Sequence, residues 1–143
     1  ALLYYFIFDE LRQQLGEKDA IKVLKRAIYR RGRQVGEQFS EFAPNDLEGL
    51  KSSFLGIIPD SGRMFEPKVE RCDTECLQIQ LESCPLKEAW EELALDDHDK
   101  TVMCEIAGEI DKGTFEAAGF SFVPDTWNPG RTGCCHLQIY RKT

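Results

Sequence analysis

Apolar residues recur every three or four positions in the first third of the chain, which is the period of an amphipathic helix. Over residues 17 to about 42 they form one stripe: Ala20, Val23, Leu24, Ala27, Ile28, Val35, Phe39 and Phe42. Gly32 and Gly36 each weaken such a helix by roughly 1 kcal/mol relative to alanine, so we expect another backbone close to them. Arg31 projects near the middle of the stripe, where a guanidinium needs an anionic partner.

The pattern changes to strict alternation in the middle of the chain. Leu77, Ile79 and Leu81 alternate with polar residues, which predicts a strand with one buried face. Residues 68–72 are expected to pair with this strand across a turn at residues 73–75. Before this hairpin, Asp46 is placed to cap a short helix, and residues 59–62 have the composition of a turn.

Two further helices and two closing strands complete the pattern. Helices are predicted from Pro85 to about residue 93 and from Asp97 to about residue 117, followed by strands over residues 120–123 and 134–140. We therefore expect an α+β fold, in which N-terminal helices pack with the later helix pair around a small antiparallel sheet. No repeat or linker divides the chain, so residues 1–143 are predicted to form a single domain.

The net charge and the hydropathy of the chain argue against several classes of binding partner. The net charge of −7 argues against nucleic acid and against an anionic membrane, so we expect a small-molecule substrate. The apolar run over residues 2–8 ends at Asp9, far short of the roughly 20 residues that span a bilayer. It lacks the flanking features of a signal peptide, and we expect a cytoplasmic protein with reduced thiols. An apolar N-terminal helix is also compatible with a homodimer.

Cys84 is the first candidate for chemistry. Proline is favoured at the first helical position, so Pro85 places Cys84 at the N-cap of its helix. Unsatisfied N–H groups and the positive end of the helix dipole favour a thiolate there, which makes Cys84 the best nucleophile candidate. The alternative is a small buried residue that caps the helix under Trp90, since free cysteine is among the most buried residue types.

The long helix that follows carries a second stripe of unusual composition. Its members are spaced for one helix face: Cys104, Gly108, Asp111 and Phe115. A thiol, a glycine, a carboxylate and an aromatic ring suit the wall of a pocket, with Cys104 and Asp111 two turns or ~10 Å apart. In the alternative interpretation, Cys104 belongs to the core and Asp111 is an exposed helix residue.

The last strand adds two candidates. Adjacent residues of a regular strand face opposite sides, so Cys135 is predicted to face the interior and Cys134 the polar side with His136. His136 has an unperturbed pKa near neutrality and suits a general acid or base, although a solvated strand histidine is the commoner case.

Metal and cofactor signatures are weak. The chain has no HExxH motif and only two histidines, so no metal site is predicted, although a composite site from Cys84, Cys104 and Cys135 stays open. It also has no glycine-rich phosphate loop, and we expect no cofactor.

Taken together, these segments resemble the family of L-2-amino-thiazoline-4-carboxylic acid hydrolases. The similar segments run over nearly the whole chain: residues 28–32, residues 84–90 (Cys-Pro-Leu-Lys-Glu-Ala-Trp), Cys104 with Asp111, residues 113–120 and residues 130–137. The order of the cysteines, with Trp90 and Asp111 between them, is the specific part of the resemblance. Many relatives have a Gly-Asp pair ahead of the last cysteines, whereas Arg131 follows Gly130 here, which alters the charge of this loop.

The resemblance implies a hydrolase. Its expected reaction opens a small cyclic amidine-like ring, 2-amino-thiazoline-4-carboxylate or a related compound, to an N-carbamoyl amino acid. In the corresponding hypothesis Arg31 holds the substrate carboxylate bidentately, and Trp90 and Phe115 contact the substrate.

Two attacking groups are open in this hypothesis. A thiolate at Cys84 or Cys104, or a water activated by Asp111 or His136, attacks the ring carbon between sulfur and nitrogen. Asp111 would protonate the ring nitrogen if burial raises its pKa. The alternative function is a small-molecule, metal or redox-sensing cysteine module without turnover, and a third is a docking partner in a larger enzyme.

Overall fold

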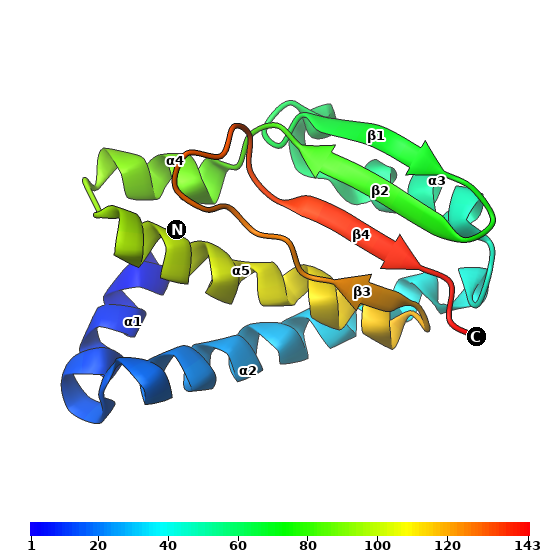
Figure 1. Cartoon of the computed structure of the whole chain (residues 1–143). Coiled ribbons are helices and arrows are strands. Elements are labelled where there is room, and N and C mark those ends of the chain that lie inside the picture. The colour runs from blue at the N-terminus through cyan, green and yellow to red at the C-terminus, as the bar shows by residue number, and fades with distance from the viewer.

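The computed structural model describes residues 1–143, and its helices and strands follow the predicted order. The helices are α1 (Leu2–Leu15), α2 (Glu17–Gly36), α3 (Leu47–Ile57), α4 (Pro85–Glu92) and α5 (Asp97–Ala117), with short 3₁₀ segments η1 (Glu37–Phe42) and η2 (Pro59–Gly62). The strands are β1 (Pro67–Cys72), β2 (Cys76–Leu81), β3 (Ser121–Val123) and β4 (His136–Tyr140). Five helices with one antiparallel sheet confirm the α+β prediction (Figure 1).

The four strands form a sheet in the order β1-β2-β4-β3, with every neighbouring pair antiparallel. Leu77 pairs with Ile139 and Ile79 with Leu137, so the alternating apolar residues of β2 and β4 share the buried face. Helix α3 and the second half of α5 cover this face, and Asp46 caps α3 by accepting a hydrogen bond from the Gly49 N–H at 2.9 Å. The predicted hairpin and helix cap are therefore confirmed.

Helices α2 and α5 lie side by side and run in the same direction (Figure 1). A Cβ at Gly32 would overlap the carbonyl oxygen of Ile110, and one at Gly36 would overlap that of Thr114. On the facing helix, a Cβ at Gly113 would overlap the Tyr29 carbonyl oxygen. The close backbone approach expected from the glycines is confirmed.

The buried stripe of α2 differs from the predicted one. Every fourth residue is buried: Ala20, Leu24, Ile28, Gly32 and Gly36. Val23 and Ala27 are exposed, and Arg31 lies with them on the outer face. The expected position of Arg31 in the apolar stripe is therefore wrong. Gly32 and Gly36 have no side chain and so do not contribute to the apolar pattern, yet they lie on the face of α2 that packs against α5.

The hydrophobic interior consists of two clusters. One lies between the sheet, α3 and the end of α5, and includes Phe54 and Leu81. The other lies between α1, α2, α4 and the first half of α5, and includes Trp90 and Cys104. Helix α5 contributes to both and so joins the helical layer to the sheet. None of the helices has the length and apolar composition that a bilayer crossing requires.

Candidate active site

A cavity of about 230 Å³ lies where the two hydrophobic clusters meet. Residues of α3, α4, α5, η2 and the end of β2 line it, and 14 of the 18 lining residues are hydrophobic. Asp111 is the one charged residue in this lining. Pockets for drug-sized ligands span roughly 300–1,000 Å³, so this cavity suits a smaller ligand.

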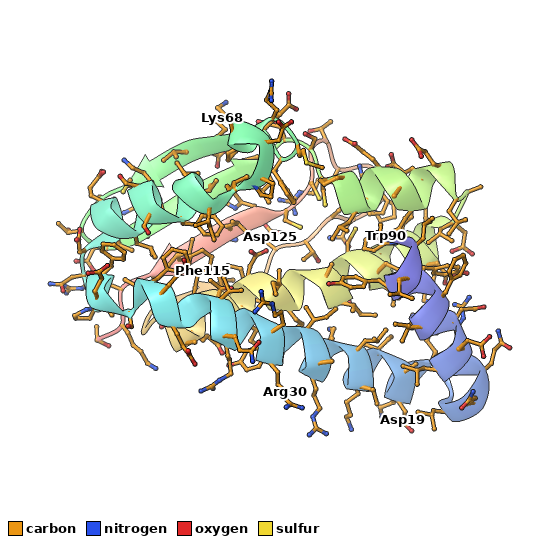
Figure 2. The ribbon with its side chains drawn as sticks, turned by 180° about the vertical axis from the view of Figure 1, so that it is seen from behind. Asp19, Arg30, Lys68, Trp90, Phe115 and Asp125 are labelled. Atoms are coloured by element: carbon orange, nitrogen blue, oxygen red, sulfur yellow. The ribbon has the colours of Figure 1, made fainter.

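Three members of the predicted pocket wall on α5 line the cavity. These are Cys104, Gly108 and Asp111. Phe115, the fourth, is fully buried in the sheet-side cluster, where its ring lies 5.0 Å from that of Phe54 and 5.6 Å from that of Phe122 (Figure 2). The expected place of Phe115 in the pocket wall is therefore wrong, because one further turn of α5 carries the side chain under the sheet.

Cys84 lies at the N-cap of α4, as Pro85 predicted, and lines the cavity. The backbone N–H groups of Lys87 and Leu86 favour the thiolate, although the Cys84 side chain makes no capping hydrogen bond. Two stronger effects oppose them: contact with the Cys134 thiol, and then burial, together raise the pKa of Cys84 well above its ordinary value. The expected activation by the helix end is therefore overridden.

Cys134 and Cys135 both line the cavity, which corrects the expectation that they face opposite sides. The strand begins only at His136, and the two cysteines share Leu81 as their partner. The Cys134 N–H donates to the Leu81 carbonyl at 2.9 Å, while the Leu81 N–H donates to the Cys135 carbonyl at 2.9 Å. Two residues opposite one is the arrangement of a β-bulge, and it breaks the alternation.

Cys134 is thus the cavity residue that sequence reasoning missed. Gly133, which precedes it, has a φ of 75°, a conformation that glycine adopts readily. A glycine directly before a predicted strand was the available signal of an irregular strand start.

The sulfur atoms of Cys84, Cys134 and Cys135 form a row. Cys134 Sγ lies 3.7 Å from Cys135 Sγ, and the Cys84 thiol also contacts Cys134. Neither this row nor the composite set of Cys84, Cys104 and Cys135 brings three sulfurs within 4.8 Å of one another. The group of three possible metal ligands that meets this distance is Glu17, His98 and Asp99.

That second cluster lies at the start of α5, away from the cavity lining, and its groups have partners. His98 contacts Glu17 at 2.6 Å, and the Arg12 guanidinium donates to both carboxylate oxygens of Asp99 at 2.8 and 3.0 Å.

Two other cavity thiols, those of Cys104 and Cys134, also favour their neutral form. Burial raises the pKa of Cys104 to about 12, and contact with the Cys135 thiol raises that of Cys134 to about 12. At neutral pH these cysteines therefore present S–H groups to the cavity.

Asp111 is the charged residue of the cavity lining, and its carboxyl group has an unusual environment. Its carboxyl group has neither a hydrogen-bond donor nor a cation as partner within the protein, and burial raises its pKa to about 7. A carboxyl group in this state can donate a proton or accept one near neutral pH.

Trp90 and Arg31 have contrasting positions. The Trp90 ring is fully buried at the cavity wall, and its Nε1–H donates to the Ala1 carbonyl at 2.9 Å (Figure 2). Arg31 lies on the exposed face of α2, where its guanidinium contacts Gln34 at 3.3 Å. Its neighbour Arg30 also points away from the rest of the molecule (Figure 2). No cation lines the cavity, so Arg31 is not brought together with the thiols.

His136 lies outside the main cavity, in a narrow crevice beside it. Gly108, Asp111 and Cys135 line both spaces. The site therefore combines Cys84, Cys104, Asp111 and Cys135 around one cavity, adds Cys134, and places His136 behind its wall.

Comparison with known proteins identifies the family of the chain. No curated protein sequence matches the chain. The family model described as L-2-amino-thiazoline-4-carboxylic acid hydrolase matches residues 1–138, and the match includes every cavity residue. The chain therefore belongs to the L-2-amino-thiazoline-4-carboxylic acid hydrolase family.

Proposed function

We propose that the protein is a hydrolase that opens a small cyclic amidine, 2-amino-thiazoline-4-carboxylate or a close relative, to an N-carbamoyl amino acid. The observation that carries the proposal is the unpartnered Asp111 carboxyl group in an otherwise apolar cavity. Family membership supports the same class of reaction.

Asp111 suits an amidine-like substrate. The ring nitrogen and the exocyclic amino group of a protonated 2-amino-thiazoline form a planar pair of N–H donors, which can bind both oxygens of one carboxylate. The surrounding apolar wall strengthens this ion pair relative to water. The substrate carboxylate then points away from Asp111 toward the mouth of the cavity, since the lining holds no cation for it.

The reaction is balanced by one water molecule. Water attacks the ring carbon between sulfur and nitrogen, and one of its protons passes to the Asp111 carboxylate. The carbon–sulfur bond breaks, the new hydroxyl group becomes the carbonyl of the carbamoyl group, and its proton passes to the departing sulfur. Starting from the protonated ring, each turnover therefore leaves one extra proton on Asp111.

The state of the thiols favours water over a cysteine as the attacking group. The pKa values of Cys84, Cys104 and Cys134 are raised, and a neutral thiol is a poor nucleophile. We propose that the cavity thiols shape the apolar wall and that an S–H group contacts the leaving sulfur.

Product analysis with three variants tests the proposal. The unchanged protein is expected to convert the thiazoline carboxylate to a ring-opened product with a new free thiol. Asp111→Asn is expected to lower kcat at least 100-fold, since general acid–base catalysis contributes about 10²–10⁴. Cys84→Ser and Cys104→Ser are expected to retain turnover within about 10-fold. Absence of product in the unchanged protein rejects the function, and loss of turnover in a serine variant restores the thiolate mechanism.

The row of sulfurs supports a second candidate, a redox-responsive module without turnover. Cys134 contacts the thiols of Cys84 and Cys135, so oxidation by a peroxide could join it to Cys84. Mass spectrometry after peroxide treatment, with and without a reductant, tests this function, which requires a reversible loss of two hydrogens in a protein that has no hydrolase activity.

A further inference from the structure

The crevice beside the apolar cavity is a second space at this site, and its lining is polar. Six of the residues that line it carry the argument: Gly108, Asp111, Asp125, Thr126, Cys135 and His136. Its volume is about 10 Å³, which is close to the roughly 10–15 Å³ that one water molecule needs. Asp111, Asp125, Thr126 and His136 all have polar groups, so the crevice has the polar lining that a buried water requires.

His136 lies between two carboxylates. Its Nε2 contacts Glu70 Oε2 at 3.0 Å, and its Nδ1 lies 3.6 Å from Asp125 Oδ2. Its backbone N–H also donates to the Asp125 carbonyl at 2.9 Å, and Arg131 binds both carboxylate oxygens of Asp125. The imidazole is therefore fixed in place, with only 15% of its side chain exposed.

Glu70 connects this histidine to solvent. The pairing of β1 with β2 shifts register between Val69 and Arg71, which leaves Glu70 at the irregularity. Such bulges redirect side chains, often beside functional sites. The Glu70 side chain is 41% exposed, so the contact with His136 has water on its far side.

We propose that the crevice holds one water molecule and that this water, His136 and Glu70 form a proton path from Asp111 to solvent (Figure 2 labels Asp125, which lines the crevice). The inference rests on the proposed function. Each turnover leaves a proton on Asp111, which passes to the water while a proton of that water passes to His136, and His136 returns one to solvent through Glu70. His136 and Glu70 act here as positioning and relay residues that do not touch the substrate.

Charged side chains face His136 from three elements of the structure. Glu70 faces it from β1, Asp125 with its partner Arg131 from the segment before β4, and Asp111 across the crevice from α5. Glu70 lies within hydrogen-bond distance of the imidazole, the Asp125 carboxylate lies 3.6 Å from it, and Asp111 supplies the proton.

Kinetics of His136→Asn and Glu70→Gln test the path. Both variants are expected to lower kcat about 10- to 100-fold with little change in KM, because proton release becomes the slow step. A small diffusible base such as imidazole is expected to restore the rate, and the kcat ratio in H₂O and D₂O is expected to increase. His98→Asn is the matched control, since the other histidine is exposed and pairs with Glu17 away from the cavity.

Unchanged kcat in His136→Asn overturns the relay, and so does a loss that imidazole cannot rescue in a folded variant. If the unchanged protein has no hydrolase activity, NMR titration of the imidazole gives an independent answer. The ¹⁵N shifts of His136 are expected to show an inflection near pH 7 from Asp111, and this inflection is expected to disappear in Asp111→Asn. Identical titrations in both proteins reject the water bridge.

Discussion

Gly32 of α2 lies directly against the backbone of Ile110 in α5, where a Cβ would overlap the Ile110 carbonyl oxygen. Asp111 is the next residue of α5 and faces the cavity. The close helix contact therefore sets the position of the wall that carries the carboxyl group, although neither glycine of α2 lines the cavity.

Gly32→Ala and Gly36→Ala are expected to destabilise the protein by about 2 kcal/mol or more, because the helices must separate to admit a methyl group. Urea unfolding measures the change. Gly56→Ala is the control, since a Cβ there has nothing within 4 Å and alanine favours a helix by up to about 1 kcal/mol. Equal stability of the Gly32 and Gly56 variants contradicts the close approach.

The raised pKa of Asp111 predicts that the stability of the protein depends on pH. Burial raises its pKa from 3.8 to about 7, so the folded state holds this proton more tightly than the unfolded state. The free energy of unfolding is therefore expected to decrease as pH rises from about 4 to 7, by up to roughly 4 kcal/mol from this group.

Urea unfolding of Asp111→Asn at pH 5 and pH 8 isolates that contribution. The variant is expected to be the more stable protein at pH 8 and to lose its advantage toward acid pH, since an amide does not ionise. Asp19→Asn, at an exposed position on α2, is expected to show no such trend (Figure 2). A constant difference between Asp111→Asn and the unchanged protein across this range means that Asp111 does not titrate near pH 7 in the folded protein.

The thiols of Cys104 and Cys134 are expected to resist alkylation in the folded protein. Cys104 and Cys134 have pKa values raised to about 12 and are buried, so iodoacetamide at neutral pH is expected to modify them at least about 100-fold more slowly than a free peptide thiol. Mass spectrometry after timed exposure measures this rate, and urea-unfolded protein is the reference. Rapid modification of either residue at pH 7 shows that a thiolate is present and argues for the nucleophilic mechanism.

Arg31→Gln is expected to leave KM within about twofold of the unchanged protein, because the guanidinium lies on the outer face of α2. Steady-state kinetics with the thiazoline carboxylate measures it, with Arg30→Gln as the neighbouring control. An increase of KM in Arg31→Gln alone places this residue at the substrate carboxylate.

The order of helices and strands followed from the sequence because each depends on local signals. Alternation at Leu77, Ile79 and Leu81 predicted the central strand, and Asp46 and Pro85 predicted helix starts, all of which depend on neighbouring residues alone. Helical spacing likewise predicted that Cys104, Gly108 and Asp111 share one face of α5, and this prediction needs no knowledge of the neighbouring elements.

Only the tertiary structure decided which face of α2 is buried, where Cys134 points and how readily the thiols ionise. Glycine carries no hydropathy signal of its own, so the contact of Gly32 with Ile110, which leaves Arg31 in solvent, depends on the partner helix. The bulge at Cys134 depends on Leu81, 53 positions earlier in the chain. The pKa of Cys84 depends on a thiol that the fold brings to it, and that contact outweighs the helix end encoded beside it.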